Sequence, residues 1–390
     1  MHSVQQFLRS LPAIQQPDWE GHADIQQVRD EISSLPPLVD IDDVDDLRAL
    51  LAEAAAGRVG IIQSGDCAED WDECAPDDIA RKAGLLEALA GVMKMNSRKP
   101  VLRVGRMAGQ FGKPRSNPTE TIDGVEFPVY RGHMVNGPEP DLEQRRPDPR
   151  RMLKGYHSAR GVLDSLGWAG RGRGSLSTTP VWTSHEALLL DYELPMLRTQ
   201  PDGRLLLAST HWPWIGERTR QLDGAHVAML AAVTNPVACK VGPTMTVDDL
   251  LKLCQKLDPE RIPGRLTLIA RMGADNVGEK LPALAAAVRA AGHPVIWLTD
   301  PMHGNTVGGP EGLKTRLVTT VVREVVEFHR AVTEAGAVAG GIHLETTPDE
   351  VTECVPDQHR LHEVGHKYTS LCDPRLNPGQ AISVASAWLG

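Results

Sequence analysis

The run VGIIQ at residues 59–63 is followed by a long amphipathic segment at 79–95 and by a second apolar run, VLRVGR, at 101–106. Short apolar or β-branched runs are typical of strands, and the apolar spacing of the segment between them is typical of a helix. A strand, a helix and a strand in this order predict two parallel strands joined by a crossover helix. Residues 59–106 therefore predict the repeating unit of an α/β fold.

The same unit recurs along most of the chain. Six further runs are expected to be strands: TTPVWTS (178–184), LLLAST (205–210), VACKV (237–241), LTLIAR (266–271), PVIWLT (294–299) and VAGGIHLE (338–345). Helices are expected at 186–198, 217–232, 245–257, 278–292 and 311–335. Eight units favour closure into a (β/α)8 or TIM barrel, because an open doubly wound sheet usually has fewer strands and begins with a glycine-rich nucleotide loop. The sequence contains no GxGxxG or GxxxxGK(S/T) motif.

A single barrel domain is expected to span the 390 residues, since such barrels routinely exceed about 250 residues. Residues 1–57 predict a helical lead-in, and residues 58–390 predict the barrel. Within the lead-in, IDDVDDLRALLAEAAAG (41–57) has the acidic start and glycine stop of a capped helix. The stretch 107–177 is too long for a simple crossover and is rich in turn signals. We expect it to include a functional loop over the barrel mouth.

The composition excludes several classes of protein. A net charge of −10 argues against nucleic-acid binding, which normally requires a basic surplus. No apolar stretch approaches the roughly 18 to 20 uninterrupted residues that cross a bilayer, so no membrane span is expected. Six scattered cysteines without CxxC pairs, and the lack of a signal peptide at the start, favour the reducing cytoplasm.

Ionisable or metal-binding side chains lie at or just after the end of nearly every predicted strand. Because the carboxyl ends of barrel strands converge on one face, these side chains are expected to share a site. They are Cys67, Arg106, Glu217, Arg218, Lys240, Arg271, His303 and Glu345. Taken alone, each of these residues is readily explained by a structural role. A lone buried Cys usually packs as a small hydrophobic residue, and an Arg at a strand end often only pairs with an acid.

Sorted by chemistry, the candidates form two sets. Cys67, His303 and Glu345, with Asp373 as a fourth candidate, supply sulfur, nitrogen and oxygen donors that suit a borderline divalent metal better than magnesium or calcium. The second set is cationic and can hold phosphates and a carboxylate. It comprises Arg106, Lys113, Arg115, Arg218, Lys240 and Arg271. The residues themselves therefore predict a metal-assisted barrel enzyme that acts on phosphorylated substrates.

Longer motifs resemble a known family. They are GDCAE (65–69), GRMAGQFGKPRS (105–116), HWPWIGERTRQLDGAHV (211–227), KVGPT (240–244), ARMGADNV (270–277), DPMHGN (300–305), GGIHLE (340–345) and CDPRLN (372–377). Together they resemble type II 3-deoxy-D-arabino-heptulosonate 7-phosphate (DAHP) synthase, and the resemblance runs from QQPDW (15–19) to the last residues. It implies a transferase that condenses phosphoenolpyruvate with erythrose 4-phosphate, the first step of the shikimate route.

The resemblance also implies roles for individual residues. It implies a divalent metal, manganese or cobalt, held by Cys67, His303, Glu345 and Asp373, and phosphoenolpyruvate contacts from Arg106, Glu217, Lys240 and Arg271. Erythrose 4-phosphate would contact Lys113, Arg115, Ser116 and Arg218. In the implied mechanism the metal polarises the aldehyde, C3 of phosphoenolpyruvate attacks it, water adds at C2, and phosphate leaves by C–O cleavage. Cys67, Glu217, Lys240 and His303 are the expected catalytic residues, with Lys240 a candidate proton donor.

Two departures from the family pattern leave alternatives open. His133 stands where family members usually carry an acid, so an aminoDAHP synthase that uses an amino or imino tetrose remains an alternative. The chain also lacks the long N-terminal extension and inserted helices of longer members, and so resembles the synthases of secondary-metabolite clusters, such as the phenazine type. We therefore expect weak or absent inhibition by aromatic amino acids.

Three further expectations complete the interpretation. The competing functions are a barrel lyase or aldolase with other substrates, and a catalytically silent paralogue that binds phosphometabolites and regulates a partner enzyme. The family forms dimers and tetramers, so a homo-oligomer is expected. Because Cys67 and Asp373 would share one metal, the neighbouring Cys372 should approach Cys67, and oxidation of this pair could block metal binding.

Overall fold

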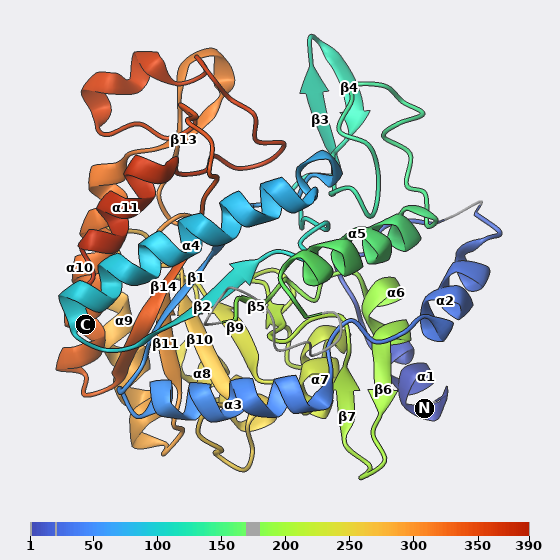
Figure 1. Ribbon diagram of the computed structural model, residues 1–390, viewed down its shortest axis with the longest axis horizontal. Coiled ribbons are helices and arrows are strands. Elements are labelled where there is room, and N and C mark those ends of the chain that lie inside the picture. Colours follow the sequence, from blue (N-terminus) through green and yellow to red (C-terminus); the bar gives the residue numbers. More distant parts are fainter. Residues whose placement is uncertain (1, 20–21, 169–179, 390) are drawn as a thin grey trace.

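Eight parallel strands form the centre of the molecule in the computed structural model, which describes residues 2–19, 22–168 and 180–389. Their order around the sheet is β5, β2, β1, β14, β11, β10, β9 and β8. The strands are β1 (Gly60–Gly65), β2 (Val101–Arg106), β5 (Trp182–Thr183), β8 (Trp214–Ile215), β9 (Val237–Val241), β10 (Leu266–Ala270), β11 (Ile296–Thr299) and β14 (Val338–Glu345). Figure 1 shows β1, β2, β9, β10, β11 and β14 grouped near the centre of the molecule, with helices packed around them.

Backbone hydrogen bonds between the two end strands close this sheet. The amide of Trp212 donates to the carbonyl of Thr183 at 3.2 Å, and the amide of Trp214 donates to His185 at 3.1 Å. In the other direction the amide of Ala187 donates to Trp214 at 3.0 Å. The predicted (β/α)8 barrel is therefore confirmed. The run predicted at 178–184 contributes β5, although its first two residues lie outside the described ranges.

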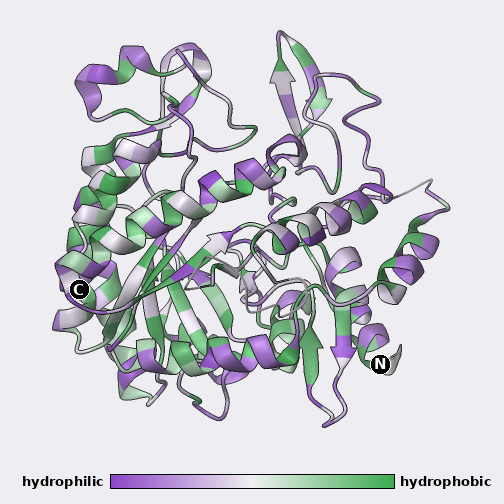
Figure 2. Ribbon diagram, viewed as in Figure 1, coloured by the Kyte–Doolittle hydropathy of each residue, from purple (hydrophilic) through white to green (hydrophobic). Residues whose placement is uncertain are grey.

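Helices cover the outside of the barrel. They are α4 (Pro76–Ser97), α7 (Ala225–Ala232), α8 (Val247–Leu257), α9 (Val277–Ala290), α10 (Val318–Glu334) and α11 (Pro378–Ser386). Local sequence explains their ends: α4 begins with Pro76, and Thr246 caps α8 by accepting a hydrogen bond from the amide of Asp249 at 3.1 Å. Figure 2 shows green strands in the interior and purple patches on the helices. The helices predicted at 79–95, 245–257 and 278–292 are confirmed.

The fourth predicted run forms a strand, but its expected place in the barrel was wrong. Residues Leu205–Leu207 form β7, which pairs antiparallel with β6 (Leu197–Thr199) in a hairpin outside the barrel sheet. The barrel uses the two-residue β8 in its place. Strand propensity is a local property and does not determine which sheet a run joins. The run LLLAST therefore gave a stronger strand signal than the two residues that form the barrel strand.

Three predicted helices need correction. Of 186–198, only α6 (Leu190–Glu193) and a 3-10 turn at Leu194–Met196 are helical, and the backbone nitrogen of Pro195 cannot donate a hydrogen bond. Of 217–232, only α7 is helical. The segment 311–335 begins with β13 (Lys314–Arg316), which pairs with β12 (Thr306–Gly308), before α10 starts at Val318. Glu186, Glu217 and Lys314, from the non-helical parts of these segments, line a cavity at the carboxyl ends of the barrel strands.

The N-terminal segment contains α1 (His2–Ser10), α2 (Ile25–Ser34) and α3 (Ile41–Ala55). The last of these closes the bottom of the barrel, because Leu47, Leu51 and Ala54 pack with Ile61 and Ile296 from the starts of two strands. The helix ends just before Gly57, whose φ of 74° lies in the left-handed region that glycine tolerates. The opposite end of the barrel, where the strands finish, remains open to ligands.

The stretch 107–168 lies beside this open end. It forms a hairpin of β3 (Thr119–Ile122) and β4 (Val125–Pro128), followed by α5 (Arg151–Ser165). Glu69 holds the start of the stretch, since its carboxylate accepts hydrogen bonds from the amides of Ala108, Gly109 and Gln110 at 2.7 to 3.0 Å. None of the helices within the described ranges combines the length and apolar content needed to cross a lipid bilayer.

Candidate active site

A cavity of about 490 Å³ lies at the carboxyl ends of the barrel strands. Residues of the β3–β4 hairpin, including Thr119 and Glu120, form part of its wall, as expected for the stretch after residue 107. Of the twelve site residues expected from the sequence, eleven line it: Cys67, Arg106, Lys113, Arg115, Ser116, Glu217, Arg218, Lys240, Arg271, His303 and Asp373. The twelfth, Glu345, is fully buried beneath its floor.

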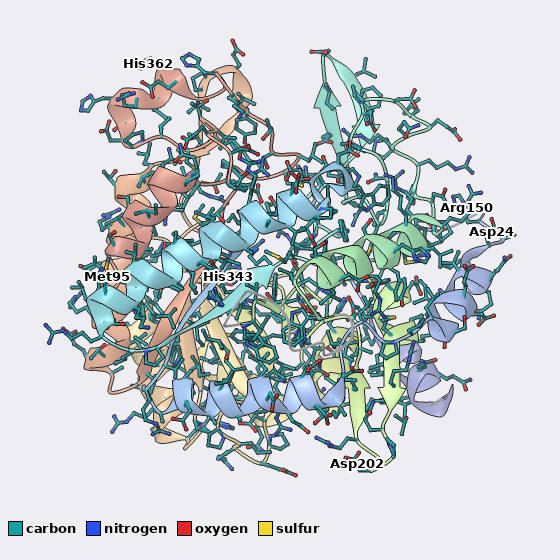
Figure 3. The ribbon with its side chains drawn as sticks, viewed as in Figure 1. Asp24, Met95, Arg150, Asp202, His343 and His362 are labelled. Atoms are coloured by element: carbon teal, nitrogen blue, oxygen red, sulfur yellow. The ribbon has the colours of Figure 1, made fainter. Side chains whose placement is uncertain are left out.

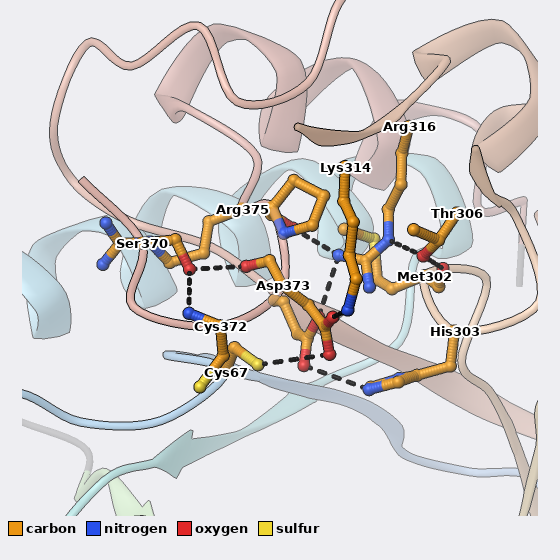
Figure 4. A network of polar contacts seen from close by, with 12 residues as sticks. Cys67, Met302, His303, Thr306, Lys314, Arg316, Ser370, Cys372, Asp373 and Arg375 are labelled. Carbon is orange, nitrogen blue, oxygen red and sulfur yellow. Dashed lines mark hydrogen bonds and ion pairs between the residues drawn. The ribbon is translucent and has the colours of Figure 1, made fainter. Parts of the chain in front are cut away.

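Three of the four expected metal ligands form a compact group. The donor atoms of Cys67, Glu345 and Asp373 all lie within 4.8 Å of one another. The fourth, His303, has Nε2 3.2 Å from Oε1 of Glu345, and Figure 4 shows it pointing toward the same group. Its Nδ1 lies 2.7 Å from Oδ2 of Asp300, which leaves Nε2 free to face the cluster. A thiol, an imidazole and two carboxylates fit a borderline divalent metal.

The carboxylates of this group stay ionised inside the protein. Burial opposes ionisation of Glu345, but His303 and Arg316, whose Nη1 lies 2.8 Å from Oε2, outweigh it and hold the pKa well below its usual range. Burial likewise opposes ionisation of Asp373, and Lys113, with Nζ at 2.7 Å, holds that pKa well below its usual range. The site therefore presents two negative charges to a cation.

The thiol of Cys67 behaves differently. Burial and a hydrogen bond with Cys372 raise its pKa well above the usual range, even though Lys113 Nζ lies 2.5 Å from its sulfur. Figure 4 shows the two sulfurs of Cys67 and Cys372 next to each other, and all six cysteines are free thiols. Since only a thiolate binds metals strongly, a cation at Cys67 must displace its proton.

A cationic wall, formed by Arg106, Lys240 and Arg271, lies next to the ligand group. Lys240, at the end of β9, lies 2.5 Å from Asp300, and burial together with Arg106 lowers its pKa to about 8. Arg106 is anchored by Nη2 on Glu345 at 3.2 Å and by Nε on the carbonyl of Asp66 at 3.1 Å. Arg271 donates to the carbonyl of His303 at 3.0 Å. The anchors hold three cations in fixed positions beside the donor cluster.

His343 and Trp214 support this wall from the barrel interior. Figure 3 places His343 in the middle of the molecule, where its Nε2 lies 2.5 Å from Nη1 of Arg106. Burial, followed by Lys240 and Arg106, holds the pKa of His343 well below its usual range, so the neutral ring can accept from the guanidinium. The ring of Trp214 lies 5.4 Å from the guanidinium carbon of Arg106, within cation–π range.

The outer end of the cavity carries the remaining expected residues. Arg218 Nη2 donates to Ser116 Oγ at 2.6 Å, joining the segments after β8 and after β2. Arg115 pairs with Glu120 at 3.2 Å, and Glu217 pairs with Arg220 at 2.7 Å. The expected residues therefore divide into an inner group around Cys67 and an outer group around Arg218. Lys113 is the one proposed aldose contact that lies with the inner group.

Comparison with known proteins identifies the family to which this chain belongs. A model of the class-II DAHP synthetase family matches residues 3–172 and 161–388. The chain belongs to that family. Its members carry a divalent-metal requirement that the donor set around Glu345 fits.

Relatives of this class-II DAHP synthetase share most of its length. A Pseudomonas fluorescens protein named as a probable phospho-2-dehydro-3-deoxyheptonate aldolase is 56% identical, over 96% of this chain and 94% of its own. Phospho-2-dehydro-3-deoxyheptonate aldolases of Streptomyces coelicolor and Neurospora crassa are 40% and 37% identical, each over 97% of this chain and over 94% and 92% of their own. The solved phospho-2-dehydro-3-deoxyheptonate aldolase of Francisella tularensis SCHU S4 is 14% identical with a TM-score of 0.56, covering 94% of this chain and 97% of its own, which shows a shared fold.

Sequence reasoning missed two acidic residues of this synthetase cavity. Glu186 lines it, and its Oε1 is buried with no hydrogen-bond partner among the described residues. Burial raises the pKa of Glu186 against the opposing charges of Lys113 and Lys240. Asp300, also in the wall, joins Lys240 to His303. Asp300 directly follows one predicted strand and Glu186 lies two residues after another, so the strand-end rule that selected the other residues could have found them.

His133, the residue that departs from the family pattern, lies away from this cavity. Its ring stacks on Trp71 with centroids 4.7 Å apart, and its Nε2 lies 3.1 Å from Oδ1 of Asp70. It is buried and is not among the described residues that line the cavity. The position gives no support to a direct contact between His133 and an aldose.

Proposed function

We propose that this protein condenses phosphoenolpyruvate with erythrose 4-phosphate and water to give DAHP and phosphate. The observation that carries the proposal is the pairing, in one cavity, of a four-donor group around Glu345 with a fixed cationic wall of Arg106, Lys240 and Arg271. The family membership and the named relatives support the same reaction. A complete donor set argues against the silent regulatory paralogue, which would not need one.

We assign the metal site to Cys67, His303, Glu345 and Asp373, with Mn²⁺ or Co²⁺ as the first ions to test. An ion bound there supplies Lewis-acid polarisation of the aldehyde oxygen of erythrose 4-phosphate. The protein's own part is to keep two carboxylates charged and the His303 ring oriented by Asp300. These groups preorganise the reacting end of the cavity.

The cationic wall suits phosphoenolpyruvate, which carries a carboxylate and a phosphate. Arginine forks bind both groups in bidentate fashion, and Arg106 and Arg271 both line the cavity. C3 of phosphoenolpyruvate attacks the aldehyde carbon, water adds at C2, and the phosphate leaves with its C–O bond electrons. Lys240 lines the cavity and is our candidate for the donor of the proton that the new hydroxyl requires. Glu217, in the outer group, is a further catalytic candidate.

The outer group suits the phosphate of erythrose 4-phosphate. Arg115, Ser116 and Arg218 line that end of the cavity, and Ser116 and Arg218 already contact each other. A phosphate there would place the aldehyde carbon toward Cys67 and Lys113. This arrangement orients the aldose so that its reactive carbon faces both the donor group and the phosphoenolpyruvate wall.

One coupled assay tests the proposal. The purified protein is stripped with EDTA, supplied with both substrates and a panel of divalent ions, and followed by the loss of phosphoenolpyruvate absorbance. We expect turnover that needs both substrates and returns only with a divalent ion. No consumption with any ion would refute the function, and faster turnover of an amino tetrose phosphate would favour the aminoDAHP alternative. Turnover with another aldehyde only would indicate a different aldolase or lyase.

Several finer expectations stay predictions. We propose a homo-oligomer, dimer or tetramer, which light scattering coupled to size exclusion measures. We place the protein in the cytoplasm, where phosphorylated sugars are retained. We also propose a supply role in secondary metabolism with weak or absent feedback control, which micromolar inhibition by tryptophan, tyrosine or phenylalanine in a steady-state assay would refute.

A further inference from the structure

The loop at residues 369–375, which carries Cys372 and Asp373, is wrapped around one buried carboxylate. Glu353 is fully buried and accepts hydrogen bonds from the amides of Thr369 at 3.0 Å, Ser370 at 2.8 Å and Arg375 at 2.7 Å. A loop lacks the regular backbone hydrogen bonds that fix the path of a strand or a helix. Glu353 fixes the path of this loop by accepting hydrogen bonds from three of its backbone amides.

Arg375 extends this anchor across the site. Its Nη2 and Nε donate to the two oxygens of Glu353 at 3.0 and 3.2 Å, while Nη1 donates to Oδ1 of Asp66 at 2.9 Å. Asp66 directly precedes Cys67, and Arg375 follows Asp373 by two positions. One guanidinium therefore connects the two loops that carry Cys67 and Asp373, although 309 residues separate its partner Asp66 from it in sequence.

Asp66 is held from its other side as well. Lys82, on α4, places Nζ 2.7 Å from Oδ2 of Asp66, and both side chains are almost fully buried. Burial opposes ionisation of Asp66, but Lys82 and Arg375 outweigh it and lower the pKa. The backbone carbonyl of the same residue accepts the hydrogen bond from Arg106. Asp66 thus touches the cationic wall through its backbone and the C-terminal loop through its side chain.

We propose that the Asp66–Arg375 ion pair, anchored by Glu353 and Lys82, sets the separation of Cys67 and Asp373 and is a positioning device for the proposed metal site, on which this inference rests. Neither Cys67 nor Asp373 lies in a strand, so the barrel ladder does not fix the gap between them. Figure 4 shows Arg375 behind Asp373, on the side away from His303. Groups that hold ligands in this way typically contribute about 10- to 100-fold in metal affinity.

The test compares two buried arginines. Arg375→Met removes the charge and keeps an unbranched, flexible side chain of about the length of the aliphatic part of arginine. Arg265→Met is the matched control, because Arg265 is similarly buried but donates to the carbonyls of Leu230, Asn235 and Leu257 at the opposite end of the barrel. EDTA-treated proteins are titrated with Co²⁺ while the near-ultraviolet thiolate-to-cobalt absorption is recorded. Thermal midpoints of both variants are measured alongside.

We expect Arg375→Met to weaken Co²⁺ binding about 10- to 100-fold and to reduce the thiolate band, with Arg265→Met staying within about twofold of the wild type. Asp66→Asn, which keeps the shape of the side chain, should act in the same direction, and Arg375→Lys should lose less. These two decide the matter if Arg375→Met does not fold.

Unchanged Co²⁺ affinity and band in folded Arg375→Met and Asp66→Asn would overturn the positioning role while leaving the metal site intact. The same result in Asp66→Asn and Arg375→Lys would do so where Arg375→Met is unfolded. A wild-type protein that shows no thiolate band at any Co²⁺ concentration would overturn the proposed site itself, and this inference with it.

Discussion

Lys240 and His303 share a single carboxylate oxygen. Oδ2 of Asp300 lies 2.5 Å from Nζ of Lys240 and 2.7 Å from Nδ1 of His303, and the carboxylate is fully buried. Burial opposes its ionisation, but His303 and Lys240 outweigh burial and hold the pKa of Asp300 well below its usual range. One charge thereby orients a proposed metal ligand and a proposed phosphoenolpyruvate contact at once.

Asp300→Asn should therefore damage both functions together. An amide cannot supply the charge that both partners need, so metal affinity should fall about 10- to 100-fold and the KM for phosphoenolpyruvate should rise. Metal titration and steady-state kinetics measure the two effects. Asp258→Asn is the control, since Asp258 is a buried carboxyl that caps the amide of Ile262 outside the cavity. A change in metal affinity alone would show that Lys240 does not depend on Asp300.

Lys240 should impose an alkaline limit on turnover. Burial lowers its pKa to about 8, so the charged form is lost as the pH rises through that value. We expect kcat/KM for phosphoenolpyruvate to fall above about pH 8 with the slope of one proton. Lys240→Arg should move the limit upward if only the charge matters, but should lower kcat by about 10²- to 10⁴-fold if Lys240 gives up a proton. A profile flat to about pH 10 would remove Lys240 from both roles.

Glu186 should matter for turnover and little for stability. Its Oε1 is buried without a hydrogen-bond partner in the described part of the chain, so Glu186→Gln breaks no bond at that atom. If the carboxyl exchanges a proton during the reaction, kcat should fall about 10²-fold or more, while the thermal midpoint changes little. Kinetics and thermal unfolding measure both quantities, and a kcat within about twofold of the wild type would give Glu186 a passive role.

The adjacent sulfurs of Cys67 and Cys372 should form a disulfide when the metal-free protein is oxidised in air. Oxygen accepts the two electrons, and each thiol loses one proton. Thiol titration should then find two fewer than the six free thiols of the reduced protein, whereas metal-loaded protein should keep all six. Cys372→Ser should protect the metal site from oxidation. Six thiols in the air-oxidised, metal-free protein would dismiss this switch.

Local patterns were enough to predict most of the barrel. The runs that became β1, β9, β10, β11 and β14 are rich in apolar or β-branched residues, and each carries a site residue at its end or just after it. The two-residue strands β5 and β8 gave weaker signals, because two residues are too few to show a strand pattern. For this reason the run 205–210 was predicted as the fourth barrel strand in place of Trp214–Ile215. The helix expected from residue 217 begins only at Ala225.

The amino-acid sequence by itself determined that strands and helices alternate and that Cys67, Lys240, His303 and Glu345 stand at strand ends, because both depend on spacing along the chain. Only the tertiary structure decided that Arg375 pairs with Asp66 and that Asp300 serves two partners. Such contacts arise when a closed barrel brings distant loops together in a buried space. In that space a side chain pairs with the group whose charge and hydrogen-bonding direction fit its own, and the order of residues along the chain does not contain this information.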